Sequence, residues 1–153
     1  MTSTYPNAID EILDTFNVEW EKPSTAAIVG YTPQVFWPGI ERPKIPPTNL
    51  YYVEVETSSV SEDQKTLSNF VDGVGKKRYN NKGMLFVNIF APLSDSKHME
   101  LGGDLSVVAQ NSLRGKTTTS CIYFTNVVIL NMGHSSKFFH FRVVADYNYD
   151  DIG

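Results

Sequence analysis

The run Met84-Leu85-Phe86-Val87-Asn88-Ile89-Phe90-Ala91 constrains the fold of this chain more than any other stretch. Only Asn88 is polar, and Gly83 and Pro92 bracket the run. A helix is the weaker interpretation, because the run is short and Pro92 would end it early. In extended form the eight residues span roughly 26 Å. A strand that is apolar on both faces must be covered on both, so we predict a central strand of a sheet.

The length of 153 residues predicts one domain, long enough to bury a single hydrophobic core. With 41% hydrophobic and 20% charged residues, the composition excludes global disorder, and no apolar run approaches the twenty residues of a membrane span. The first residues lack the basic and apolar regions of a signal peptide, so we expect assembly in the cytoplasm. The net charge of −4 argues against a protein that mainly binds the nucleic-acid backbone.

Hydrophobic periodicity predicts the other elements. Apolar residues recur at helical spacing over residues 5–16, which indicates an amphipathic helix. Residues 26–30 form a short apolar run and predict a strand, and residues 50–57 alternate as a half-buried strand does. Asp95 or Ser96 could cap a second helix that runs to about residue 113. We expect it to start firmly only at about residue 103 or 104, because Gly102-Gly103 weaken its first turn. Residues 117–132 and 136–149 predict the two strands of a hairpin.

Two segments between these elements are predicted to be irregular. Residues 31–47 form a Pro-rich arm, in which prolines deny the donors that a sheet interior needs, so we expect edge pairing at most. The arm is either a surface loop that Phe36 and Trp37 pin into the core or an extension that packs on a neighbouring subunit. Residues 58–77 are polar, and with the basic residues up to 82 they predict a long connecting loop.

These elements describe a single domain over residues 1–153 of the α+β class. Strands joined as hairpins, with one helix between them, favour a mainly antiparallel sheet of about four to five strands with two helices packed on one face.

The ionisable residues form no recognisable catalytic or metal-binding pattern. His98, His134 and His140 lack a second His or Cys at ligand spacing, which argues against zinc. Cys121 lies in the apolar run Cys-Ile-Tyr-Phe and is predicted to be a buried core thiol. The stretch Gly73-Val74-Gly75-Lys76-Lys77 lacks the preceding strand and the Ser or Thr of a phosphate loop. We expect no catalytic residue, no cofactor and no metal, and a binding or structural protein rather than an enzyme.

The basic residues Lys76, Lys77, Arg78 and Lys82, with Tyr79 among them, form the one basic cluster of the sequence. The cluster is either a solvated loop, which we favour, or a contact to phosphate groups.

The order of elements and one motif carry a resemblance to a known family. The motif is Arg78-Tyr79-x-x-x-Gly83-Met84-Leu85-Phe86-Val87-Asn88-Ile89-Phe90-x-Pro92, followed by a helix and a closing strand hairpin. It is preceded by a helix at residues 7–16, a Pro-rich approach and a strand at residues 50–56. In this layout the chain resembles the tail terminator (tail completion) family of long-tailed bacteriophages.

The resemblance implies a structural virion protein at the head-proximal end of the tail, assembled in the host cytoplasm. Such a protein caps the tail tube as a homo-hexameric ring, ends tube polymerisation and forms the surface for head–tail joining. Its partners are further copies of itself, the tail tube protein and the head–tail connector protein, with no membrane involved. DNA passes through the ring without specific binding.

The arm and the loop are the predicted contact segments, because a ring closes through head-to-tail interfaces that arms and long loops can form. The predicted interface residues are Phe36, Trp37, Lys76, Lys77, Arg78, Tyr79 and Lys82. One alternative is another phage neck or head–tail connector protein, or a tail tube subunit. Another is a small hydrolase or nucleotide-binding enzyme, which a pocket converging on His98, His134 or His140 would favour.

Overall fold

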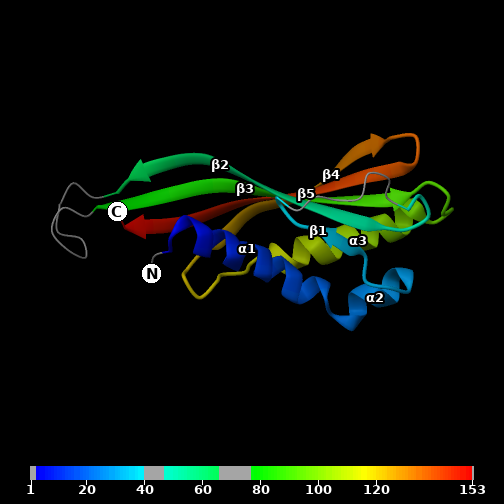
Figure 1. Cartoon of the computed structure of the whole chain (residues 1–153), viewed down its shortest axis with the longest axis horizontal. Helices are drawn as coiled ribbons and strands as arrows, with labels where there is room; N and C mark the ends of the chain where they lie inside the picture. The colour runs from blue at the N-terminus through cyan, green and yellow to red at the C-terminus, as the bar shows by residue number, and fades with distance from the viewer. Residues whose placement is uncertain (1–2, 40–46, 66–76, 153) are drawn as a thin grey trace.

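A computed structural model describes residues 3–39, 47–65 and 77–152 of the chain. The elements are α1 (Tyr5–Trp20), α2 (Pro23–Val29), β1 (Gln34–Phe36), β2 (Tyr52–Gln64), β3 (Arg78–Pro92), α3 (His98–Leu113), β4 (Tyr123–His134) and β5 (Phe138–Ile152). The strands form one sheet in the order β1-β2-β3-β5-β4. Only β1 and β2 are parallel, and the helices lie together on one face of the sheet (Figure 1). The α+β class and the mainly antiparallel sheet are confirmed.

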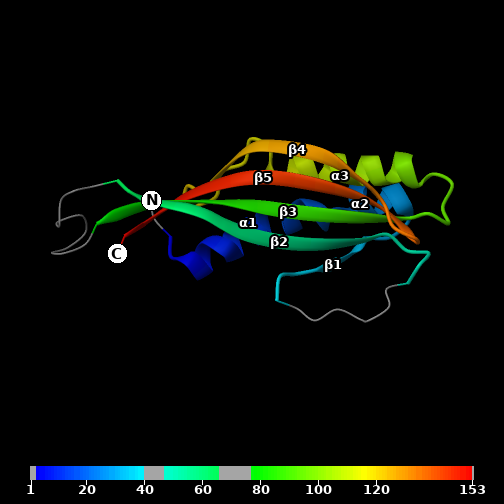
Figure 2. The same cartoon turned by 90° about the horizontal axis from the view of Figure 1, so that it is seen from above.

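The apolar run at residues 84–91 lies in β3, the central strand, as predicted. Leu85, Val87 and Ile89 are fully buried and belong to the core beneath the helices. Met84, Phe86 and Phe90, which point the other way, are only half-buried. Figure 2 looks onto this second face, with α1 passing behind the strands. The prediction that this strand is buried on both faces is therefore wrong, as far as the described residues show.

The main core forms between the sheet and the helices α1 and α3. Helix α1 ends at Trp20 rather than at residue 16. Four fully buried residues follow one another in α1 at four-residue intervals: Ala8, Ile12, Phe16 and Trp20. They form one apolar side of the helix, which faces the core. The Trp20 ring stacks on Phe16 with 5.2 Å between ring centroids, and its Nε1 donates a hydrogen bond to the Pro33 carbonyl at 3.1 Å. The helix layer is thereby tied to the segment that leads into β1.

Residues 26–30 were predicted to form a strand, and this prediction is wrong, because they belong to α2 and its C-cap. Pro23 begins the helix at a position where its missing N–H costs no hydrogen bond. Gly30, with φ of 87°, ends it in the left-handed conformation. The apolar run is too short to show a period of its own, so helix and strand could not be distinguished from its pattern.

The second predicted helix, α3, begins at His98, soon after the expected caps Asp95 and Ser96 and five residues before the firm start expected at about residue 103. Gly102 is buried in it, and a Cβ built there would lie 2.5 Å from the Phe141 ring and 3.2 Å from the Ala91 Cβ. The absence of a side chain lets α3 approach β5 and β3 closely. This packing outweighs the intrinsic cost of glycine in a helix.

Much of the predicted loop at residues 58–82 is strand. β2 continues to Gln64 and β3 starts at Arg78, with Gln64 paired to Tyr79. Residues 66–76 lie outside the described residues, as do residues 40–46 of the Pro-rich arm. The described part of the arm has the expected edge pairing, since β1 pairs with the start of β2 at one edge of the sheet. The β2–β3 hairpin continues past the first residues of α1 (Figure 1).

The predicted closing hairpin is present as β4 and β5, although β4 begins only at Tyr123. A turn precedes it, in which the Thr118 N–H donates to the Ile122 carbonyl and the Cys121 N–H to the Thr118 carbonyl. Cys121 lies in this turn with φ of 62°, and its side chain is exposed. The prediction of a buried thiol is wrong, because the turn directs Ile122 rather than Cys121 into the core.

Candidate functional site

The sheet face opposite the helices is the candidate functional surface, and we call it the uncovered face. Strand register places its residues in rows that run across the sheet. The rows are Tyr52, Phe90 and His140; Glu54, Asn88, Arg142 and Leu130; Glu56, Phe86, Val144 and Val128. Large apolar side chains thus flank a polar row.

The first row forms a packed aromatic cluster. The Phe90 ring stacks on Tyr52 and on His140, with 4.6 Å between centroids in each pair. Phe138 and Phe36 meet Tyr52 edge-on at 5.1 and 5.8 Å. Tyr52, Phe36 and Phe138 are buried in this cluster, which is separate from the main core. The cluster therefore gives the uncovered face a rigid apolar end.

The polar row is organised by Asn88, which is only 2% exposed. Its Oδ1 accepts hydrogen bonds from His140 Nε2 at 2.9 Å and from Arg142 Nε at 2.7 Å, and its Nδ2 donates to the Glu54 carbonyl at 3.3 Å. Because an amide oxygen only accepts, Nε2 of His140 carries the proton. The guanidinium carbon of Arg142 lies 5.1 Å from the Phe86 ring centroid, a cation–π distance.

Burial lowers the pKa of His140 below its ordinary value of 6.5, and the positive charge of Arg142 adds to this, while Glu56 opposes it. Neutral His140 is therefore the favoured form at neutral pH. In that form its Nδ1 has no proton and can accept a hydrogen bond from a partner.

The depressed pKa of His140 predicts that the folded state loses stability in acid. As the pH falls below about 6.5, the His140 imidazole is protonated in the unfolded chain before it is protonated in the folded protein, so the free energy of unfolding decreases. The decrease is complete once the pH lies below the pKa of His140 in the folded protein. Urea unfolding between about pH 5 and pH 7.5 should give a shallower pH dependence for His140→Phe than for the wild type. His134→Gln, which removes an exposed histidine at the end of β4, is the control substitution. Equal slopes for His140→Phe and the wild type would contradict the assignment.

Exposed apolar side chains border the uncovered face on both sides. Along the β4 margin, Tyr123, Val128 and Leu130 are 42–45% exposed. Near the β2–β3 hairpin, Val60 is 62% exposed and lines a hollow of about 330 Å³ with Met84 and Lys82, among others. Exposed apolar groups gathered on one face are typical of a surface that another protein covers.

The predicted anchors Phe36 and Trp37 point to opposite faces of the sheet. Phe36 is buried in the aromatic cluster, whereas Trp37 is half-buried against the helices, with its ring edge-on to Phe16 at 6.1 Å. Both side chains are packed within their own chain, as the first interpretation of the arm expected.

The predicted basic residues lie elsewhere. Lys77 directly precedes β3, and Arg78, Tyr79 and Lys82 lie in the first five residues of this strand. Lys76 lies outside the described residues. Phe36 pairs with Glu54 near the start of β2, whereas Tyr79 pairs with Gln64 at its end. The structure therefore does not bring the two groups of predicted interface residues together.

The three histidines have separate partners. His98 Nδ1 lies 2.8 Å from the Asp95 carbonyl, His134 contacts the Ser135 carbonyl, and His140 belongs to the Asn88 row. Among the described residues, no group of three or more His, Cys, Asp or Glu side chains is placed to hold a metal ion. Within the same residues, no helix has the length and apolar character needed to cross a membrane.

The Asn88 row was not predicted from the sequence, although one signal for it was present. A lone Asn in an apolar central strand needs hydrogen-bond partners, because burying an unpaired amide is costly. His140 was expected only at the sheet surface. Arg142 carried no signal of its own, since its pairing with Asn88 depends on the register of β3 with β5.

Comparisons with known proteins identify no family. No protein-family profile matches the chain, and no curated protein matches it. Among solved structures, one match covers 90% of this chain and 94% of its own, with 13% sequence identity and a TM-score of 0.46. The name of that protein gives no function, and a likeness at this level supports no conclusion about activity or assembly.

Proposed function

We propose that this chain is a structural virion protein of a long-tailed bacteriophage, which forms a closed ring on the last ring of the tail tube. The ring ends tube polymerisation and presents the surface to which the head connector joins. The uncovered face carries the proposal. It has an aromatic cluster at one end and exposed Val128, Leu130 and Val60 along its margins, a surface that suits burial in an assembly.

The element order supports the same function. The motif on which the family resemblance rests, residues 78–92, coincides with the central strand β3, and α3 and the β4–β5 hairpin follow it. A head-to-tail interface joins two different surfaces of each subunit and generates a ring when the rotation closes. In this proposal the ring is a homo-hexamer, the tail tube protein and the connector protein bind its two ends, and DNA passes through its centre.

The first test is the assembly state of the purified protein, alone and with a tail tube protein. Light scattering after size exclusion and negative-stain microscopy should show rings of one size, and added ring protein should stop the growth of tubes. Long tubes formed by the pure protein would instead identify a tube subunit. A protein that stays monomeric alone and in the presence of tubes would contradict the proposal.

The uncovered face should be needed for this assembly. The double substitution Val128→Glu/Leu130→Glu places two carboxylates on its β4 margin and should abolish rings or tube capping while leaving the circular dichroism spectrum unchanged. Met99→Glu/Val107→Glu is the matched control, because Met99 and Val107 are 46% and 45% exposed but lie on α3, in the helix layer. Equal assembly of both variants would show that the uncovered face is not buried in the ring.

A further inference from the structure

Arg142 is the cation of the polar row on the uncovered face, and two contacts hold its guanidinium group in place. Its Nε donates to Asn88 Oδ1 at 2.7 Å, and its guanidinium carbon lies 5.1 Å from the Phe86 ring centroid. Asn88 is 2% exposed and is itself fixed by the hydrogen bond that it donates to the Glu54 carbonyl. A guanidinium group anchored in this way is already oriented for a partner, so little freedom is lost when one binds.

The residues around Arg142 leave its positive charge unpaired. Four side chains surround it in the sheet, and none of them is an acid: Asn88, Leu130, His140 and Val144. Glu54 and Glu56 lie on β2, two strand spacings or roughly 10 Å from β5. Asp146, farther along β5, accepts a hydrogen bond from the Asn126 amide at 2.9 Å. Within the described ranges, Arg142 forms no ion pair with Asp or Glu.

Arg142 also has unused hydrogen-bond donors. A guanidinium group carries five N–H donors, and here only Nε–H is bound within the part of the chain that the structure describes. The four N–H groups of the two terminal nitrogens, Nη1 and Nη2, are left for water or for a partner. A surface that covered this face would exclude that water, and a buried charge without a counter-charge is strongly unfavourable. The covering surface must therefore supply an acceptor to Arg142.

Charge favours a carboxylate of a second copy as this acceptor. A planar guanidinium group matches a carboxylate through two parallel N–H···O hydrogen bonds. A phosphate group carries more negative charge, and Glu54 and Glu56 on the same face would repel it. The chain has 17 acidic residues against 13 basic ones, so a second copy offers carboxylates in excess of its own cations.

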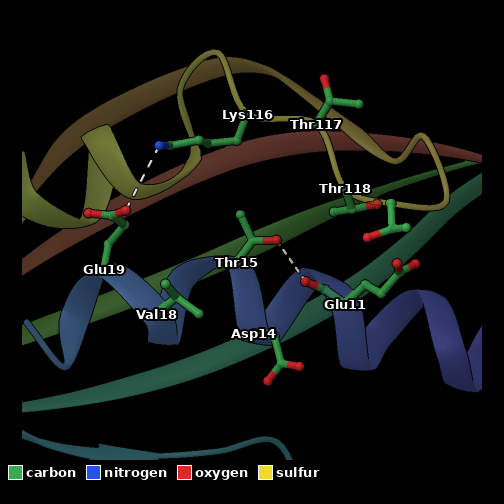
Figure 3. Close-up of a pocket in the computed structure, with 9 residues that line it drawn as sticks. Glu11, Asp14, Thr15, Val18, Glu19, Lys116, Thr117 and Thr118 are labelled. Carbon is green, nitrogen blue, oxygen red and sulfur yellow. Dashed lines mark hydrogen bonds and ion pairs between the residues drawn. The ribbon is translucent and has the colours of Figure 1, made fainter.

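The helix side of the chain shows this excess. Around the hollow of about 380 Å³ in Figure 3, Glu11, Asp14 and Glu19 face a single cation, Lys116. Lys116 lies 3.9 Å from a Glu19 carboxylate oxygen, and Asp14 is exposed. The subunit therefore has an unpaired cation on its uncovered face and more carboxylates than cations around this hollow. Opposite charges on two different surfaces are what a head-to-tail contact between copies requires.

We propose that Arg142 is a carboxylate-binding site, filled in the ring by an Asp or Glu side chain of the neighbouring copy. The site rests on the proposed function, and it names the chemical group that meets the uncovered face. The carboxylate accepts hydrogen bonds from the terminal nitrogens of Arg142, while Phe86, Val128 and Leu130 exclude water around the pair. Because the pair is desolvated on assembly, its loss has a large effect on the stability of the ring.

Arg142→Met tests the pair through the sign of its effect. The substitution leaves the neighbour's carboxylate buried without a partner, so the protein concentration needed for half-assembly should rise by about a hundredfold. Arg142→Lys, which keeps the charge but not the planar fork, should recover part of the loss. His140 still donates to Asn88 in both variants, so their circular dichroism spectra should match that of the wild type. Arg114→Met, which removes an exposed arginine at the end of α3, is the control and should assemble as the wild type does.

A charge swap identifies the carboxylate. Arg142→Glu should prevent assembly, because two carboxylates would then face each other. Each of the 17 acidic residues is changed to Lys in this background, and at one position the change should restore most of the assembly. The position that restores it is the one that meets Arg142 in the neighbouring copy.

The outcomes separate this site from the ring itself. Rings of Arg142→Met that form at the wild-type concentration would overturn the pair and leave the proposed function standing. Tighter assembly of Arg142→Met would also overturn it, because the arginine would then be buried without a counter-charge. The pair is equally overturned if no acidic position restores the assembly of Arg142→Glu. A wild-type protein that neither forms a ring nor caps a tube would overturn both proposals.

Discussion

Trp20→Ala is expected to lower the free energy of unfolding by about 3–5 kcal/mol. Trp20 is fully buried and is the largest such side chain of the core, at the end of the buried stripe of α1. Its removal leaves a cavity beneath the sheet and takes away the stacking partner of Phe16. It also leaves the Pro33 carbonyl without the Nε1 donor, which adds the cost of an unpaired acceptor.

Urea unfolding followed by circular dichroism would measure this loss, with Val18→Ala as the control on the same helix. Val18 is 64% exposed, so its truncation should change the free energy of unfolding by no more than about 0.5 kcal/mol. Trp20→Phe should fall between the two, since it keeps an aromatic ring but not the indole N–H. A loss below about 1 kcal/mol for Trp20→Ala would show that α1 is not anchored through this residue.

The elements that could be predicted from the sequence are those whose buried residues are recognisable in it, either by their regular spacing or as a long apolar run. In α1, four apolar residues at intervals of four mark the buried stripe, and in β3 a long apolar run bounded by Gly83 and Pro92 marks the central strand. The β4–β5 hairpin was predicted because β-branched and aromatic residues dominate both of its strands. In each case the side chains that identify the element also form the core.

The outer part of the β2–β3 hairpin could not be predicted in this way. Residues 58–64 are all exposed and are mostly serine, acidic or amide side chains, so no alternation of apolar and polar residues marks a strand. All of them except Val60, which lies at a register shift, pair with β3, up to Gln64 with Tyr79, and backbone hydrogen bonds carry no sequence signal. The same limit applies to the polar row, since Asn88, His140 and Arg142 meet only once the register of β3 and β5 is known.

The two glycines of α3 provide a prediction in which adjacent positions respond with opposite signs. Gly102→Ala should destabilise the fold by about 1–3 kcal/mol, because the new methyl group would overpack the contact of α3 with the sheet. The Cβ would lie 2.5 Å from a Phe141 ring carbon, and Phe141 is itself held 4.9 Å from the Phe139 ring. The Phe141 ring therefore has little room to move aside.

Gly103→Ala should instead stabilise the fold, by about 0.5–1 kcal/mol, since nothing lies within 4 Å of the added Cβ and alanine favours the helix. Urea unfolding of the two variants would show the opposite shifts directly. The double variant Gly102→Ala/Phe141→Leu should lose less stability than the sum of its two single variants, because a smaller side chain at 141 makes room for the methyl group. If both alanines stabilise α3, its closeness to β5 does not depend on Gly102, and helix propensity alone decides the effect at both positions.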